Sequence, residues 1–193
     1  MTYNLTVEDN HTFFVNDEGV LTHNMNNVLK VCNFSTEVSE KLTNGRGNHD
    51  FTGKLRGEDV TLKNVKTKEI TYVKRCLEER QALRKAFDST ERKNFLIKLS
   101  ENEQLLKEAG LSEIDILDIK EGFVPEGWQI HHKLPLDDSG DNSFENLVLI
   151  KNEPYHKVIT NYQNSIVRGL KEGEIKKIEF PIPEGSIYPL KNR

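Results

Sequence analysis

The sequence predicts an α+β fold in which a helical scaffold carries a C-terminal β-hairpin and helix, with a second hairpin at the N-terminus. Three patterns predict it. Apolar residues alternate in residues 128–132, and an apolar run in residues 144–150 follows a group of turn formers, as in two paired strands. Apolar residues recur at helical spacing in much of residues 68–121. A shorter alternation around Asp-Glu-Gly in residues 1–24 is typical of two short strands.

The scaffold is expected to contain several helices with recognisable ends. Ser100 and Ser112 suit N-caps, and Gly110 and Gly122 suit the positions just after a helix. The expected helices are residues 68–87, 90–99, 100–110 and 112–121. These helices form most of the core beneath the C-terminal hairpin.

The C-terminal hairpin and the helix after it carry half of the six histidines of the chain. His131 and His132 end the first predicted strand, so their side chains point to opposite faces. Asn152 suits an N-cap and Pro154 a first helical turn, which places His156 early on a helix that faces back over the hairpin. The pattern brings His131 and His156 within reach of one cation and leaves His132 free to act on a water.

Phosphodiester hydrolysis needs both of these functions. It develops negative charge on oxygen, which a divalent ion can neutralise, and it needs a general base for the attacking water. A neutral imidazole that titrates near pH 7 fits the base. The amide of Asn146 is suited to tie the turn to the hairpin and to hold the backbone of His132.

These residues resemble the HNH (ββα-metal) endonucleases, especially the nuclease domains of bacteriocins and polymorphic toxins. The matching pattern is His131-His132-Lys133-x-Pro135, an Asp/Gly turn, Asn146-Leu147, and His156 on the helix. The resemblance implies four catalytic residues: His131 and His156 as metal ligands, His132 as general base and Asn146 as the orienting asparagine. It also implies DNA as the substrate.

The third protein ligand departs from the family pattern. Nuclease colicins have a further histidine one helical turn after the position of His156, where this chain has Thr160. Water, Asn161 or Asn164 could complete the shell. Few protein ligands favour Mg²⁺ or Mn²⁺ over Zn²⁺ or Ni²⁺. The alternatives are a structural zinc knuckle and histidines that are simply packed polar residues.

The overall charge does not predict nucleic-acid binding. The chain has a formal net charge of -4 and a sequence pI of about 5.9, so DNA binding depends on local basic patches. One patch lies in residues 72–98 and another in residues 171–193. The candidate nucleic-acid-binding residues are Lys133, Arg84, Lys85 and Arg92. Cys32 and Cys76 are expected to be free thiols, and no apolar run has the length of a membrane span.

Residues 1–24 end in His23-Asn24 and resemble the C-terminal end of an intein-like HINT domain, the autoprocessing module before many polymorphic toxins. In that family the asparagine cyclises and the histidine assists. The nucleophile-bearing first part of such a domain is absent from this sequence, and Met25 has no nucleophilic side chain, so an inactive remnant is expected. The expected domains are the HINT remnant at 1–24, a linker or irregular region at 25–66 and the HNH nuclease at 67–193.

The two resemblances together predict an antibacterial nuclease toxin, monomeric, with a cognate immunity protein that binds it tightly. They imply secretion or delivery from the producing bacterium by a route not encoded in this chain, and action in the cytoplasm of the target cell. Two rival interpretations remain: an HNH nuclease of defence or mobile-element type, and a non-catalytic metal-knuckle binding module.

Overall fold

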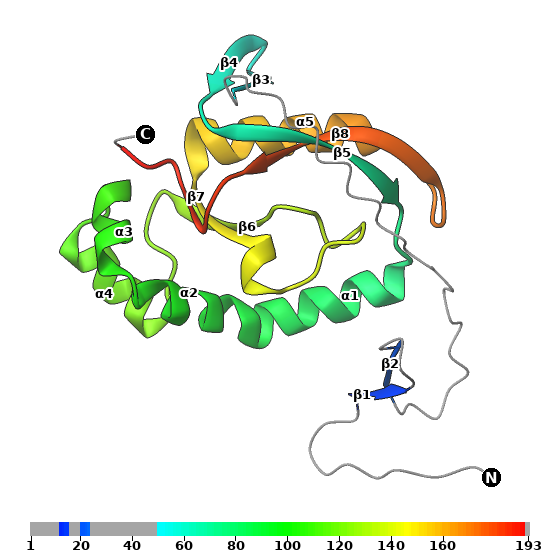
Figure 1. Cartoon of the computed structure of the whole chain (residues 1–193), viewed down its shortest axis with the longest axis horizontal. Helices are drawn as coiled ribbons and strands as arrows, with labels where there is room; N and C mark the ends of the chain where they lie inside the picture. The colour runs from blue at the N-terminus through cyan, green and yellow to red at the C-terminus, as the bar shows by residue number, and fades with distance from the viewer. Residues whose placement is uncertain (1–11, 16–19, 24–49, 192–193) are drawn as a thin grey trace. The chain divides into compact units, whose positions relative to one another are not determined.

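The computed structural model describes residues 12–15, 20–23 and 50–191, and the fold is α+β as predicted. The chain forms two compact units, residues 1–36 and 37–193. In the first unit, β1 (Thr12–Val15) pairs antiparallel with β2 (Val20–His23), which confirms the predicted N-terminal hairpin (Figure 1). Asn24 lies outside the described residues.

The predicted C-terminal hairpin is the centre of the second unit. β6 (Trp128–His132) pairs antiparallel with β7 (Leu147–Lys151), and β9 (Ile187–Tyr188) joins β7 in parallel on its other edge. β7 begins three residues later than expected, because Phe144–Asn146 forms a turn of 3₁₀ helix. Four consecutive apolar residues of β7 are buried, as in a strand covered on both faces.

The helical scaffold begins later than the sequence predicts. α1 (Leu77–Ala86) continues through a π-helical turn (Phe87–Glu91) into α2 (Arg92–Ser100). α3 (Glu103–Ala109) and α4 (Glu113–Glu121) follow. The predicted helix over residues 68–87 is wrong in its first part, where β5 (Val65–Val73) pairs along its whole length with β8 (Ile175–Pro183).

The reason for this error lies in the side chains of β5. Ile70 and Val73 are three residues apart, which also fits a helical face. Val65, Thr67 and Thr71 add further β-branched residues, whose side chains favour an extended backbone. The partner strand β8 lies about a hundred residues away in the sequence, so the pairing that decides the conformation is invisible to a local pattern.

The helix ends are partly as predicted. Ser112 and Asp115 form a reciprocal capping box, and Gly122 ends α4 in the left-handed conformation with φ of 85°. Ser100 is not an N-cap, because its hydroxyl donates to the carbonyl of Ile97 at 2.6 Å. Asn102 caps α3 instead, accepting a hydrogen bond from the Leu105 amide.

Part of the expected linker is structured. β3 (Phe51–Leu55) and β4 (Glu58–Leu62) form an antiparallel hairpin that packs against α5 (Lys157–Val167). The contact is close: a Cβ atom on Gly53 would lie 2.7 Å from Cγ1 of Val158. The expectation of an irregular region is therefore wrong from residue 51 onward, while residues 25–49 lie outside the described residues.

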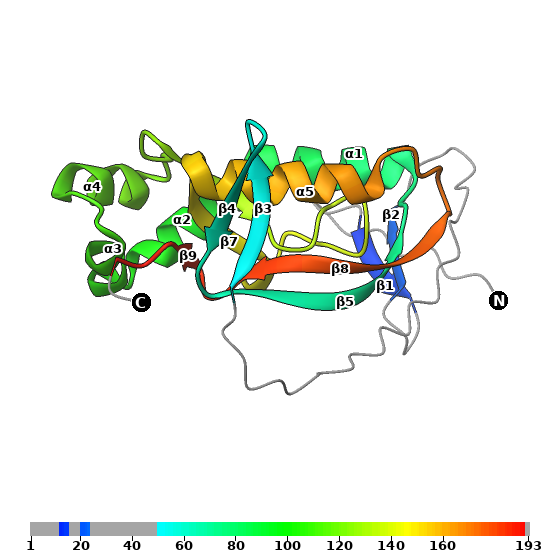
Figure 2. The same ribbon diagram turned by 90° about the horizontal axis from the view of Figure 1, so that it is seen from above.

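The elements of the second unit place the hairpin between two helices. α1 runs along one side of β6 and α5 along the other (Figure 1). The ribbon of β5 and β8 lies beneath α5 in Figure 2, with Tyr72, Ile178 and Phe180 buried between them. None of the helices in the described residues is long and apolar enough to cross a membrane.

Candidate active site

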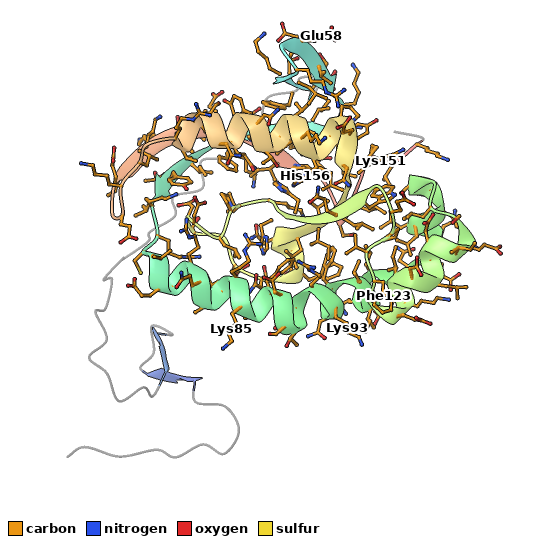
Figure 3. All side chains as sticks on the ribbon, turned by 180° about the vertical axis from the view of Figure 1, so that it is seen from behind. Glu58, Lys85, Lys93, Phe123, Lys151 and His156 are labelled. Carbon is orange, nitrogen blue, oxygen red and sulfur yellow. The ribbon has the colours of Figure 1, made fainter. Side chains whose placement is uncertain are left out.

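A cleft of about 550 Å³ lies between α1, β6 and α5. Arg80 and Arg84 line it from α1, His131 and His132 from β6, and His156 from the start of α5. The three histidines that the sequence singled out therefore all line one cleft. Figure 3 shows His156 on the side of its helix that faces the hairpin.

His131 and His156 lie edge to face, with 5.1 Å between their ring centroids. The alternation of β6 turns His131 toward α5, where its side chain is 8% exposed. Burial lowers the pKa of His131 to about 3, and the neighbouring His156 contributes to the shift. Burial also lowers the pKa of His156. Both rings are therefore neutral at pH 7, the state in which imidazole binds a metal ion.

His132 faces the opposite side of β6, as predicted. Its ring packs edge-on against Phe87, 4.6 Å between centroids, and its Nε2 lies 2.9 Å from Oδ1 of Asn142. The Asn142 amide nitrogen donates to the carbonyl of Leu83 at the same distance, so its oxygen is left to accept. His132 therefore carries its proton on Nε2, and its lone pair is on Nδ1. Burial lowers the pKa of His132, which keeps the ring neutral.

Asn142 is a site residue that sequence reasoning missed. It is the last of the six residues Asp-Asp-Ser-Gly-Asp-Asn, all of which suit a turn. Arg75, which lies just before α1, holds the same loop by donating to the carbonyls of Leu136 at 2.9 Å and Gly140 at 2.8 Å. No local signal separates Asn142 from its neighbours, because its partners come from β6 and α1.

Asn146 ties the loop to the hairpin, as expected, but through a different residue. Its Oδ1 accepts from the Leu134 amide at 2.8 Å, and its Nδ2 donates to the carbonyls of Leu134 and Asp141 at 3.0 and 2.8 Å. The side chain holds Leu134 and not the backbone of His132. Its support of His132 is thus indirect, through the loop that presents Asn142.

The expected start of the last helix is partly wrong. Asn152 makes no capping hydrogen bond to that helix; its side-chain oxygen accepts from Gln129 instead. Residues Asn152–His156 form an irregular turn, in which Glu153 has an extended backbone, before α5 continues. His156 nevertheless lies at the helix start, as predicted, so the error changes the cap and leaves the site intact.

The structure distinguishes among the candidates for a third metal ligand. The Thr160 hydroxyl lies 3.2 Å from Nε2 of His156, and Asn164 lies on the cleft with an exposed side chain. Asn161 donates its amide to the carbonyl of Lys54 and does not line the cleft. Gln163, which the sequence did not suggest, lines the cleft and is buried. Within residues 50–191, no three His, Cys, Asp or Glu side chains gather in a metal-binding group.

The predicted DNA-binding residues lie in different places. Arg84 lines the cleft, together with Arg80. Lys133 does not: its ammonium group donates to the carbonyl of Glu145 at 2.7 Å, and burial lowers its pKa. Figure 3 shows Lys85 on the outer side of α1.

Arg92 has a local partner as well. Its guanidinium pairs with Asp88 at 2.9 Å and lies over the ring of Phe87, 5.3 Å from the centroid. Arg92 therefore packs against Phe87, the ring that contacts His132, and does not line the cleft. Cys76 is a free thiol, as expected, and Cys32 lies outside the described residues.

The sequence of this chain is similar to that of a known protein. No family model matches the sequence, and no solved structure matches it. The chain is similar to "Uncharacterized protein YhhZ" of Escherichia coli (strain K12), at 48% identity over 141 residues. The matched region covers 73% of this chain and 36% of that protein, so the chain spans about a third of the length of its relative.

Proposed function

We propose that the chain is a metal-dependent endonuclease of the HNH type that hydrolyses phosphodiester bonds of DNA. The observation that carries the proposal is the division of the paired histidines of β6. His131 meets His156 at 5.1 Å on one side, while His132 is held by Asn142 on the other. One side offers neutral ligands and the other a neutral base, which is what the reaction requires.

The residues present fit a divalent ion. His131 and His156 would hold it, since both are neutral and both face the cleft. An ion bound there would neutralise the charge that develops on the phosphate oxygens. Amide, hydroxyl and water oxygens around the two imidazoles suit Mg²⁺ or Mn²⁺, whereas the imidazole nitrogens themselves suit Zn²⁺ or Ni²⁺, which are the alternatives to test.

His132 would act as the general base through Nδ1. In this step a water gives a proton to Nδ1, the water oxygen forms a bond to phosphorus, and the phosphorus–oxygen bond to the leaving group breaks. The hydrogen bond from Nε2–H to Asn142 fixes the tautomer that leaves Nδ1 unprotonated. Asn142 is a positioning residue, because it acts through His132.

DNA would bind across the cleft from the side of α1. Arg80 and Arg84 are four residues apart, so they share a helix face, and both line the cleft opposite His156. Their guanidinium groups suit phosphate oxygens. A chain with a net charge of -4 has to concentrate positive potential locally in this way.

The biological role we propose is that of an antibacterial toxin neutralised by a cognate immunity protein. The support is the hairpin that ends at His23, in the part of the sequence that resembles a HINT domain. The toxin would leave its producer by a separate delivery route and act in the cytoplasm of the target cell. Expression without the partner should then break the chromosome, and expression with it should not.

A plasmid-nicking assay tests the proposed activity. Purified protein is incubated with supercoiled DNA and Mg²⁺, Mn²⁺, Ni²⁺ or Zn²⁺, with and without chelator, beside His132→Ala. Conversion to the open-circular form with at least one ion, its loss with chelator and its loss in the variant are expected. Intact DNA from folded, metal-loaded protein would reject the nuclease and favour a non-catalytic metal-binding module.

A further inference from the structure

A buried glutamine on α5 faces the metal side of the cleft. Gln163 is 6% exposed, and its side-chain amide lies 3.4 Å from Nε2 of His131. It follows His156 by seven residues and Thr160 by three, so the three side chains share one face of the helix. A buried amide is costly unless its polar atoms find partners. Among the described residues, the hydrogen bond of this amide goes to His131 alone.

The distances around this amide fit those between ligands of a single cation. Atoms that bind one ion at about 2.1 Å lie roughly 3.0 to 3.4 Å from one another. The amide of Gln163 is 3.4 Å from Nε2 of His131, and the hydroxyl of Thr160 is 3.2 Å from Nε2 of His156. The amide is therefore placed as a neighbour of the His131 nitrogen in a coordination shell.

We propose that Gln163 supplies the third protein donor of the metal site, through its amide oxygen; the inference rests on the proposed metal-dependent function. A half-turn of the terminal amide exchanges nitrogen and oxygen with almost no change in shape, so the oxygen can take the position beside His131. Amide oxygens are ordinary ligands of hard divalent cations. In this account Gln163 takes the role that the histidine of the nuclease colicins has at the position of Thr160.

The other candidates are less suited to the role. Asn161 is committed to the carbonyl of Lys54, outside the cleft. Asn164 is exposed to solvent and makes no hydrogen bond to either histidine. Thr160 lies beside Nε2 of His156, but its neutral hydroxyl is a weaker ligand than an amide oxygen.

The charge of this ligand set has a chemical consequence. Two neutral imidazoles and a neutral amide leave the double charge of the ion uncompensated by its ligands, and the carboxylate of Asp137, which also lines the cleft, is paired with Lys74 at 2.6 Å. Such an ion attracts a phosphate more strongly than one neutralised by carboxylates. A neutral set therefore suits an anionic substrate, at the expense of affinity for the free ion.

Calorimetric titration with Mn²⁺ alone tests the inference on the full chain. Gln163→Leu removes the donor, Gln163→Glu replaces it with an anionic one, and Asn161→Leu is the matched control from the outer side of the same helix. We expect Gln163→Leu to weaken Mn²⁺ binding roughly 10- to 100-fold and Asn161→Leu to leave it unchanged. Gln163→Glu should bind Mn²⁺ more tightly than the wild type, and the visible spectrum of Co²⁺ should change in both Gln163 variants.

Each possible result either supports or overturns the assignment of Gln163 as a metal ligand. Wild-type Mn²⁺ affinity together with a wild-type Co²⁺ spectrum in Gln163→Leu would overturn the inference and leave the nuclease proposal standing. If Gln163→Leu fails to fold, Gln163→Glu decides, and unchanged affinity in that variant would also overturn the inference. Mn²⁺ binding that depends on Gln163, in a protein that cuts no DNA, would support the ligand assignment and reject the nuclease. A wild-type chain that binds neither ion would overturn both.

Discussion

The two sides of β6 place the same residue type in two different environments. His131 and His132 are neighbours, 8% and 7% exposed, and burial lowers the pKa of each. On the α5 side, a second imidazole and a buried amide surround His131. On the α1 side, Phe87 and Asn142 hold the ring of His132. Burial alone therefore does not distinguish the roles of the two histidines; their neighbours do. His131 lies beside other possible ligands of a metal ion, whereas the ring of His132 is held in one orientation in which it can accept a proton.

The largest effect should follow from removing a ring on the α5 side. His131→Ala and His156→Ala should each lose Mn²⁺ binding and reduce DNA nicking to background, because one histidine is a weak site without the other. The hydrogen bond between His132 and Asn142 stays in place in both variants. Calorimetry and the plasmid assay are run on the same samples. Undiminished Mn²⁺ affinity in either variant would remove that histidine from the ligand set.

Acid should destabilise the metal-free protein through the same buried rings. The pKa values of these histidines in the folded protein lie below the unfolded value. As the pH falls, the unfolded state therefore binds more protons than the folded state does. Stability is fully present above about pH 6.5 and declines below it, by up to about 1.4 kcal/mol per pH unit for each histidine that stays neutral. Urea unfolding in chelator, from about pH 7 to about pH 5, measures the slope.

His131→Asn is the control for this slope, because it removes the ring whose pKa is lowered to about 3. The variant should show a shallower decline of the free energy of unfolding with acid. A wild-type protein whose stability does not change over this range would contradict the assignment of the buried rings as neutral.

A smaller effect is expected on the α1 side from Asn142. Asn142→Ala removes the acceptor for His132 Nε2–H and should lower kcat about tenfold, the worth of one hydrogen bond, with KM and Mn²⁺ affinity retained. Asn142→Asp keeps an acceptor and should recover most of the loss. An unchanged kcat in Asn142→Ala, or a loss that appears in Mn²⁺ affinity, would remove its positioning role.

The smallest effect should come from removing an arginine that lines the cleft from α1. Arg84→Ala should weaken DNA binding and reduce the slope of log affinity against log salt by about 1, as for one lost phosphate contact. Lys85→Ala should change both quantities less, since Lys85 projects from the outer side of the helix (Figure 3). Fluorescence anisotropy with duplex DNA in chelator, over a range of salt, checks it. Equal slopes for the two variants would argue against DNA binding in the cleft.

The sequence predicted the elements whose signals are local. The alternation in β6 separates His131 from His132, and Ser112 and Gly122 mark the two ends of α4. The position of His156 at the start of α5 also follows from its spacing after the hairpin. These features depend on a few adjacent residues, so no knowledge of distant contacts is needed.

The features that the sequence missed depend on distant partners. β5 is a strand because β8 pairs with it, about a hundred residues later in the sequence. Asn142 is significant because Leu83 and His132 meet it, and Gln163 because His131 does. On the sequence alone, Asn142 is one more turn residue and Gln163 one more polar position on an amphipathic helix.

The most direct test of the division between the two sides is a pair of measurements on His132→Ala. Its Mn²⁺ affinity, by calorimetry, should equal that of the wild type, because the ring lies on the far side of β6 from His156. Its single-turnover DNA cleavage should be slower by roughly two to four orders of magnitude, the usual worth of a general base. A variant that loses Mn²⁺ together with activity, or one that keeps wild-type cleavage, would contradict the account.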